Sequence, residues 1–293
     1  HPFEVLERPR QRPQARHPDP RHPGGPFVPD NPPRVLTIAG SDSGGGAGIQ
    51  ADLKTITALG CYGASAITAL TAQNTTGVRG IHPVPPEFIT LQIDTVVEDI
   101  GADACKTGML ANRPVVETVV ECLKRLDLPN LVVDPVLRAQ SGDALLEADG
   151  EETVRDELLP LARVVTPNLA EAAVLCGREF TTVEEMKEAA EDIAGMGPDW
   201  AVVKGGHLEG DPVDVLSDGE DILEVRRRRV DTHNTHGTGC TYSSAIAARL
   251  AQGLAVPEAV QTARDDLQRG LEHNLSIGSG RGPLDHHAMF DMS

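Results

Sequence analysis

The sequence predicts an α/β fold in which a central, mostly parallel sheet lies between two layers of helices. Short apolar runs, typical of buried strands, alternate along the chain with longer stretches of helical periodicity. Repeated alternation of this kind favours parallel strands joined by crossover helices that cover both faces of the sheet. Hydrophobic residues make up 40% of the 293 positions, which is enough to bury a large core.

The predicted elements begin with a buried strand at residues 35–39 that leads directly into a run of glycines. The other predicted strands are residues 65–72, 103–107, 130–134, 163–166, 201–204 and 222–230. The predicted helices are residues 47–59, 86–99, 112–126, 150–159, 168–176, 182–196, 239–252 and 257–274. No linker interrupts this alternation, and we therefore expect a single domain over 34–293.

Residues 1–33 differ from the rest of the chain because they are rich in proline, arginine and histidine and hold few aliphatic side chains. Such a segment buries too little apolar surface to offset the entropy lost when it becomes ordered. We therefore expect a disordered tail before the domain.

The formal net charge is −18, and only five of the 26 basic residues are lysines. An acidic surface repels nucleic acid and anionic membranes, so neither is an expected partner. The five cysteines form no zinc-binding or disulfide pattern, no run approaches the roughly 18 apolar residues of a membrane span, and no apolar signal segment opens the chain. We expect a cytoplasmic protein and hypothesise a salt-adapted host, the alternative being a GC-rich genome.

Ligands of parallel sheets bind at the carboxyl ends of the strands, so residues that follow strands are the candidates for function. The first candidate segment is the glycine-rich run 40–52, in which glycines let the backbone approach a ligand. Asp52 comes one helical turn after Gly48, so its carboxylate is expected to face the same pocket. The alternative interpretation is a flexible connection between strand and helix.

The second candidate segment is residues 235–241, which precede an apolar helix. Gly237 and Gly239 leave backbone N–H groups free at the helix N-terminus, and this arrangement can bind an anion. Phosphoryl transfer depends on stabilising charge at such a place. The positive end of the helix also favours a thiolate at Cys240. The alternative is that Cys240 is a small packed side chain.

Three further strand ends carry polar residues. Asn168 and Glu171 share the first turn of a helix, where they suit a hydrated Mg²⁺ or, alternatively, a capping box; the two interpretations are compatible. Lys204 ends a strand and suits a phosphate contact. Asp134 ends another strand and is a candidate second acid for magnesium.

With these segments in order, the chain resembles the hydroxymethylpyrimidine/phosphomethylpyrimidine kinases of thiamine biosynthesis, which belong to the ribokinase-like superfamily. The resemblance covers residues 35–290 and rests on the motifs LTIAGSD (36–42), GAGIQADLKT (46–55), ITALTAQNT (67–75), KTGML (106–110), VDPV (133–136), TPNL (166–169), VKGGH (203–207) and NTHGTGCT (234–241). It implies a three-layer α/β/α ribokinase-like fold, ATP as donor with Mg²⁺, a monovalent cation such as K⁺ as an optional cofactor, small-molecule substrates, and a homodimer.

The resemblance also implies a role for each candidate residue. Such kinases phosphorylate the hydroxymethyl group of the pyrimidine and then the resulting monophosphate. Gln73 is implied to hydrogen-bond the aminopyrimidine edge, within a substrate pocket that includes Gly40, Ala47, Asp52 and Met109. The implied nucleotide and phosphate contacts are Asn168, Glu171, Lys204 and Thr238, with Asp134 and Glu171 holding magnesium through water. The implied catalytic set is Gly237, Gly239, Lys204 and Cys240, the last in the place of the catalytic aspartate of sugar kinases.

Two alternatives to this function stay open from the sequence. One is a pyridoxal or pyridoxine kinase, because the amide of Gln73 both donates and accepts hydrogen bonds and suits either ring. The other is a pyrimidine-sensing protein without catalysis. Against it stands the complete set Asn168, Glu171, Lys204 and Cys240, which a sensor does not require.

The charge distribution predicts that salt stabilises the fold. Residues 1–34 hold six of the 26 basic and four of the 44 acidic side chains, which leaves 20 basic and 40 acidic side chains for residues 35–293. Repulsion among these carboxylates is long-ranged at low ionic strength and is screened in concentrated salt. We therefore expect the melting temperature, measured by calorimetry, to rise substantially between dilute buffer and molar KCl. A melting temperature that does not change with salt would show that the acidic surface only reflects composition.

Overall fold

The computed structural model describes residues 31–137, 146, 148–206 and 208–290. The chain separates into two compact units, His1–Asn31 and Pro32–Ser293, and every described helix and strand belongs to the second. The predicted disordered tail lies almost wholly outside the described residues. Each helix among the described residues is too short or too polar to cross a membrane.

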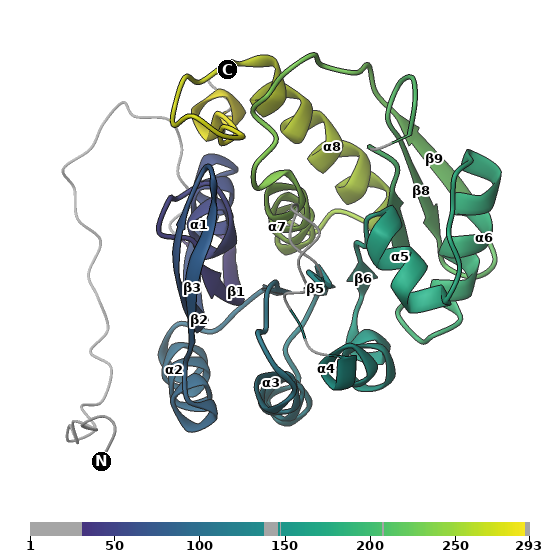
Figure 1. Ribbon diagram of the computed structural model, residues 1–293. Coiled ribbons are helices and arrows are strands. Elements are labelled where there is room, and N and C mark those ends of the chain that lie inside the picture. Colours follow the sequence, from purple (N-terminus) through teal and green to yellow (C-terminus); the bar gives the residue numbers. More distant parts are fainter. Residues whose placement is uncertain (1–30, 138–145, 147, 207, 291–293) are drawn as a thin grey trace. The chain divides into compact units, whose positions relative to one another are not determined.

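A nine-stranded sheet forms the centre of the domain, in the order β3-β2-β1-β4-β5-β6-β7-β8-β9 (Figure 1). The six inner strands are parallel, as predicted, and β3, β8 and β9 are antiparallel at the two edges. The strands are β1 (Arg34–Ser41), β2 (Tyr62–Asn74), β3 (Gly77–Pro83), β4 (Ala104–Thr107), β5 (Leu131–Val133), β6 (Val164–Val165), β7 (Ala201–Lys204), β8 (Val213–Ser217) and β9 (Ile222–Arg226).

Two hydrophobic cores lie on opposite faces of the sheet, because successive strand residues point to opposite sides. In β1, Leu36 and Ile38 join one core and Val35 joins the other. Helices α1 (Gly48–Ala58), α7 (Thr238–Ala251) and α8 (Val256–Glu272) contribute to the core that contains Val35 (Figure 1).

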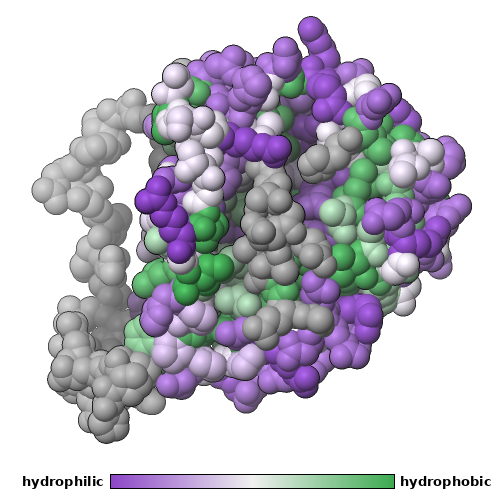
Figure 2. Space-filling view, viewed as in Figure 1, coloured by the Kyte–Doolittle hydropathy of each residue, from purple (hydrophilic) through white to green (hydrophobic). Residues whose placement is uncertain are grey.

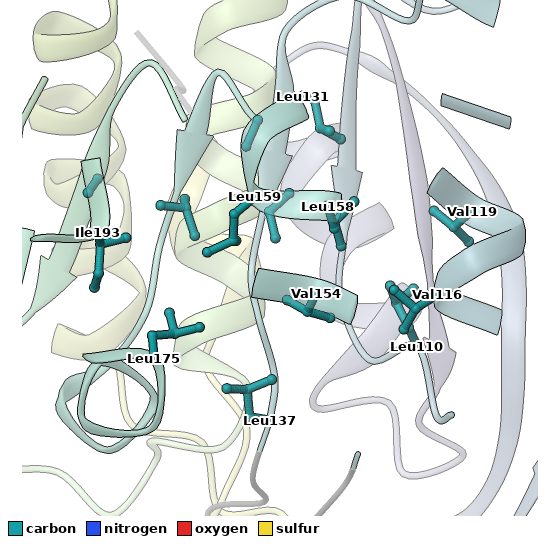
Figure 3. Packing of buried hydrophobic residues seen from close by; sticks show 14 of the residues in the cluster. Leu110, Val116, Val119, Leu131, Leu137, Val154, Leu158, Leu159, Leu175 and Ile193 are labelled. Atoms are coloured by element: carbon teal, nitrogen blue, oxygen red, sulfur yellow. The ribbon is translucent and has the colours of Figure 1, made fainter. Parts of the chain in front are cut away.

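The opposite face is covered by α2 (Pro86–Asp99), α3 (Arg113–Leu126), α4 (Ala148–Thr153), α5 (Leu169–Cys176) and α6 (Val183–Ala194). A π-helical turn (Val154–Leu158) and a 3₁₀ turn (Leu159–Leu161) follow α4, and a second 3₁₀ turn (His286–Met289) lies near α8. Figure 3 shows how aliphatic side chains from α3, β5, α5, α6 and the turns after α4 interdigitate in this core. The structure therefore confirms the predicted α/β/α layers.

All seven predicted strands are present, and two further strands were not predicted. β3 has two glycines, a proline and no buried residue, so it carries none of the alternation that marks a half-buried strand. β8 is a short, wholly buried strand of five residues with polar side chains among its valines. The predicted strand 222–230 ends already at Arg226, where pairing with β8 stops.

Candidate active site

A cavity of about 730 Å³ opens at the carboxyl ends of the parallel strands and at the N-termini of α1, α5 and α7. Its position is the one predicted for a ligand of a parallel sheet. All but one of the candidate residues line it: Gly40, Ala47, Gln73, Met109, Asp134, Asn168, Glu171, Lys204, Gly237, Thr238, Gly239 and Cys240. The exception is Asp52.

The glycine-rich connection between β1 and α1 is a tight turn rather than a flexible one. Gly48 has φ +56°, and a Cβ atom there would lie 2.4 Å from the carbonyl oxygen of Gly40. The carboxylate of Asp42 accepts hydrogen bonds from the backbone N–H groups of Gly44 (2.8 Å), Gly46 (3.0 Å) and Ala47 (2.9 Å). Asp42 therefore holds the turn closed from within.

His236 joins this turn to the second glycine-rich segment. Its Nε2 atom lies 2.9 Å from Asp42 Oδ2. Burial alone would raise the pKa of Asp42, but the hydrogen bonds from His236 and from backbone N–H groups outweigh burial and hold that pKa below its usual value. Neither Asp42 nor His236 was predicted to have a role, although both lie inside the motifs 36–42 and 234–241 on which the resemblance rests.

The N-terminus of α7 forms the predicted anion site. Its N-cap is Gly237 with φ +81°, and a Cβ atom there would lie 1.8 Å from the carbonyl oxygen of Gly46. No side chain among the described residues caps the helix, so the N–H groups of its first turn stay available at the cavity. Thr238 donates its hydroxyl to the carbonyl oxygen of Thr235 at 2.7 Å, which fixes the entry into the helix.

Cys240 lies in the first turn of α7, but its surroundings disfavour the expected thiolate. Burial raises the pKa of the Cys240 thiol to about 11, while Lys106 and the backbone N–H of Gly48 lower it and the carboxylates of Asp52 and Asp134 raise it further. Removing a charge from water outweighs the favourable helix end here. The sequence predicts that Cys240 lies at a helix N-terminus, but it does not predict how far the thiol is buried.

Asp52 does not line the cavity, contrary to the prediction. Its side chain lies between α1 and the sheet, where it contacts β1 and β4. Its two carboxylate oxygens each lie 3.0 Å from Lys106 Nζ, and both side chains are fully buried. Asp52 also accepts hydrogen bonds from Thr37 (2.6 Å) and Ser244 (2.7 Å). Burial would lower the pKa of Lys106, but the neighbouring anions, Asp52 first among them, raise it, so its charge is kept.

Lys106, rather than Asp52, lines the cavity, and sequence reasoning gave it no role. The available signal was a lysine in the middle of the otherwise apolar strand Ala104–Thr107. A buried lysine needs a partner of opposite charge. A lysine within a buried strand that ends next to a glycine therefore indicates a charged site.

A second buried ion pair lies beside the first turn of α7. Lys204 Nζ is 3.0 Å from Asp134 Oδ1, and a Cβ atom on Gly239 would lie 3.4 Å from Lys204 Nζ. Burial would lower the pKa of Lys204, but the carboxylates of Asp134 and Glu171 raise it. Lys204 therefore remains a cation where the helix N-terminus meets the cavity.

Asn168 and Glu171 form the predicted capping box of α5. The Glu171 N–H donates to Asn168 Oδ1 (3.0 Å), and the Asn168 N–H donates to Glu171 Oε2 (2.8 Å). Burial raises the pKa of Glu171 to about 7; the charge of Lys204 opposes this rise, and Asp134 adds to it. The capping interpretation is confirmed, and both side chains still line the cavity.

The carboxylates at this wall of the cavity suit a divalent cation that is held mainly by the phosphate groups of a bound molecule. Among the described residues, no three His, Cys, Asp or Glu side chains are arranged to hold a metal on their own. Asp134 and Glu171 place two carboxylates beside the one charge of Lys204; burial is the main cause of the raised pKa of Glu171, and the second carboxylate, Asp134, adds to it. A cation that keeps several waters and binds phosphate oxygens fits this arrangement.

A third ion pair lies at the α8 side of the cavity and was not predicted. Arg264 Nε is 3.1 Å from Asp214 Oδ2, and both side chains are almost wholly buried. Tyr242 lines the same part of the cavity, with its hydroxyl directed to the backbone of α8. This end of the cavity is therefore rigid and polar.

A family model and a curated relative that match this chain carry descriptions that agree. A family model described as phosphomethylpyrimidine kinase matches residues 42–285. A hydroxymethylpyrimidine/phosphomethylpyrimidine kinase of Streptomyces coelicolor is 50% identical over 261 residues, which are 89% of this chain and 97% of that protein.

Solved structures agree with the sequence relatives. The ADP complex of Bacillus subtilis pyridoxal kinase superposes with a TM-score of 0.82 at 38% identity and covers 88% of this chain and 99% of its own. The phosphomethylpyrimidine kinase of Clostridium difficile superposes with a TM-score of 0.73 at 42% identity and covers 80% of this chain and 98% of its own.

The buried pair Lys106–Asp52 predicts a large loss of stability when one partner is removed. We expect Lys106→Met to lower the free energy of unfolding in urea by about 3–5 kcal/mol, because Asp52 then stays buried without a cation. The double variant Lys106→Met/Asp52→Asn should recover part of this loss. As a matched control, Arg113→Gln breaks the exposed pair with Glu117 and should change the free energy by less than about 1 kcal/mol. Equal effects of the two single variants would contradict the account.

Proposed function

The chain belongs to the phosphomethylpyrimidine kinase family, and we propose that it transfers phosphate from ATP to the hydroxymethylpyrimidine precursor of thiamine and then to the resulting monophosphate. The observation that supports this function most directly is the cavity itself. Its lining combines the helix N-terminus at Gly237–Cys240 with residues from β1, β2 and the segment after β4, such as Gln73 and Met109 (the uncharged half), and with residues at the ends of β5 and β7, such as Lys204 (the charged half).

The uncharged half suits a flat aromatic ring with hydrogen-bonding groups on its edge. Thr71 donates its hydroxyl hydrogen to the carbonyl oxygen of Ser41 at 2.8 Å, and Gln73 Oε1 lies 3.2 Å from the same hydroxyl. The amide N–H groups of Gln73 stay available to a ring nitrogen. Gly40 leaves room for Met109, since a Cβ atom on Gly40 would lie 3.1 Å from the Met109 Cε atom. We assign Gln73 to the aminopyrimidine edge and Gly40, Ala47 and Met109 to the faces of the ring.

The charged half suits the triphosphate of ATP. Lys204 contributes a cation, and Asn168 and Thr238 contribute neutral polar groups at the same wall. We assign Asp134 and Glu171 to Mg²⁺, held through water, with a monovalent cation such as K⁺ as an optional addition. When bound, the divalent cation neutralises charge on the phosphate oxygens.

The first turn of α7 receives the transferred phosphoryl group. The N–H groups after Gly237 and Gly239 stabilise the charge that develops on its oxygens, and Lys204 adds a positive charge beside them. The substrate hydroxyl is a poor nucleophile and must lose its proton, and Cys240 is the group placed to accept it. Lys106 and the Gly48 N–H favour the thiolate that this transfer requires.

A pyridoxal kinase is the second candidate, because the Bacillus subtilis pyridoxal kinase has the same fold at a TM-score of 0.82. Gln73 suits the pyridoxal ring as well as the pyrimidine. A coupled ADP-release assay with hydroxymethylpyrimidine, its monophosphate and pyridoxal side by side tests both functions. We expect turnover of both pyrimidines. Turnover of pyridoxal alone would overturn the first function, and no ADP release with any substrate would favour a non-catalytic sensor.

We further infer a homodimer from the sheet edge at β3. Leu70 (48% exposed), Val78 (41%) and Ile81 (45%) place large apolar side chains on the β2–β3 hairpin, where Figure 2 shows hydrophobic surface. An edge strand with apolar side chains is a template for pairing with another chain, and a second copy of this chain is the occupant we propose. Light scattering during size-exclusion chromatography measures the mass directly.

The charged half predicts a loss of rate when its charges are removed. We expect Glu171→Gln and Lys204→Met each to lower kcat by about tenfold or more, because each removes charge placed on the triphosphate or its metal. Glu171→Gln keeps an oxygen that can accept the capping hydrogen bond, so the fold should persist. Near-normal kcat in both variants would contradict these assignments.

The position of Cys240 predicts a rate that rises with pH. Below its pKa of about 11, the thiolate fraction of Cys240 increases as the pH rises, so kcat/KM for the pyrimidine should increase from neutral to mildly alkaline pH. Cys240→Ala should lose most of the activity and this dependence, whereas Cys240→Asp should retain some activity. Binding of ATP, measured by calorimetry, should survive in the alanine variant. Normal turnover by Cys240→Ala would show that Cys240 only packs.

A further inference from the structure

The cations of the cavity differ in whether a carboxylate neutralises them. Four lysine or arginine side chains line the cavity among the described residues. Three of them each lie within 3.1 Å of a buried carboxylate: Lys106 with Asp52, Lys204 with Asp134, and Arg264 with Asp214. The fourth is Arg281, whose side chain has no ion pair or hydrogen bond with any described residue.

Arg281 is unusual among the cations that line the cavity, although Arg79, Arg228 and Arg229 are likewise exposed arginines that form no ion pair with a described residue. The chain carries a net charge of −18, and most exposed arginines described here have an acidic neighbour, as Arg178 has in Glu188 and Asp192. Arg281 is exposed to the cavity rather than buried, so solvent or a ligand reaches its guanidinium group. Its charge is therefore free to bind an anion that enters the cavity.

The backbone on both sides of Arg281 places it beside the hairpin that carries Gln73 and beside the segment that leads to Cys240. The N–H of Gly280 donates to Thr75 Oγ1 (3.3 Å), at the tip of the β2–β3 hairpin that also carries Gln73. The carbonyl oxygen of Gly282 accepts the N–H of His236 at 3.1 Å, four residues before Cys240. Arg281 thus lies between the proposed pyrimidine pocket and the segment that leads into the anion site.

We propose that Arg281 binds the phosphate of the phosphorylated pyrimidine and so serves the second transfer specifically. This inference rests on the proposed function. During that transfer the γ-phosphoryl group of ATP occupies the N-terminus of α7, so the phosphate already on the substrate must lie beside it. The other three cavity cations each face a carboxylate, and Lys204 is already assigned to the triphosphate of ATP. Arg281 therefore supplies the charge that a phosphate dianion requires, with a guanidinium group suited to two of its oxygens.

The unphosphorylated substrate gives Arg281 nothing to bind, because its hydroxymethyl group is uncharged. The two transfers therefore depend differently on this residue, although they use the same anion site and the same nucleotide contacts. Arg281 is therefore a specificity-determining residue: its charge lowers KM for the monophosphate and leaves KM for hydroxymethylpyrimidine unaffected.

The experiment measures KM for each pyrimidine and for ATP in the wild-type chain and in Arg281→Gln, Arg281→Lys and Arg228→Gln. We expect Arg281→Gln to raise KM for the monophosphate by about tenfold, since it removes charged hydrogen bonds. Its KM for hydroxymethylpyrimidine and for ATP should stay within about twofold, as for other surface substitutions. Arg281→Lys should retain part of the effect. Arg228 is an exposed arginine outside the cavity lining, so Arg228→Gln should leave every KM unchanged.

The outcomes separate this inference from the proposed function. If the wild-type chain phosphorylates neither pyrimidine, the proposed function is wrong. If it phosphorylates both and Arg281→Gln leaves KM for the monophosphate unchanged, or raises KM for both pyrimidines or for ATP equally, the assignment of Arg281 is wrong. Increasing KCl should also raise KM for the monophosphate more in the wild-type chain than in Arg281→Gln, because salt screens the exposed charge.

Discussion

Cations buried beneath the first turn of α7 must be neutralised where they lie, and this requirement organises the rest of the site. An ion without a partner in the protein interior is too costly for a marginally stable fold. Lys106 and Lys204 therefore each bring a carboxylate with them, Asp52 from α1 and Asp134 from the end of β5. The hydrogen bonds of Asp52 to β1 and α7 join the sheet to two helices, so the fold and the charge pattern depend on each other.

Close contacts join the two glycine-rich segments, residues 40–52 and 235–241. Gly237 fits only because it has no side chain beside Gly46, and Asp42 holds the first turn while it contacts His236 at the second. The turn after β1 and the N-terminus of α7 are thus held together by direct contacts rather than being two loops that happen to be close. An arrangement of this kind aligns the substrate hydroxyl with the helix N-terminus before the nucleotide arrives, which is how positioning contributes to phosphoryl transfer.

The sequence predicted the order of the layers and the site well, because alternation and strand ends are local features. Twelve of the thirteen candidate residues line the cavity for this reason. Asp52 was placed wrongly because helical spacing gives a face of α1 but not whether that face meets the mouth or the sheet. The expectation of a thiolate at Cys240 did not include the effect of burial on its pKa, because burial depends on the whole fold. Arg264 and Asp214 come from elements far apart in sequence, so no local pattern joins them.

The central claim is that one cavity, with one anion site, carries both phosphoryl transfers. The most direct test is to measure how hydroxymethylpyrimidine inhibits formation of the pyrimidine diphosphate from the monophosphate at constant ATP. Two substrates of one site compete, so the account predicts competitive inhibition, with an inhibition constant equal to the KM of hydroxymethylpyrimidine as a substrate. Inhibition that raising the monophosphate concentration does not relieve, or no inhibition at all, would show that the two transfers occur at different sites and would contradict the account.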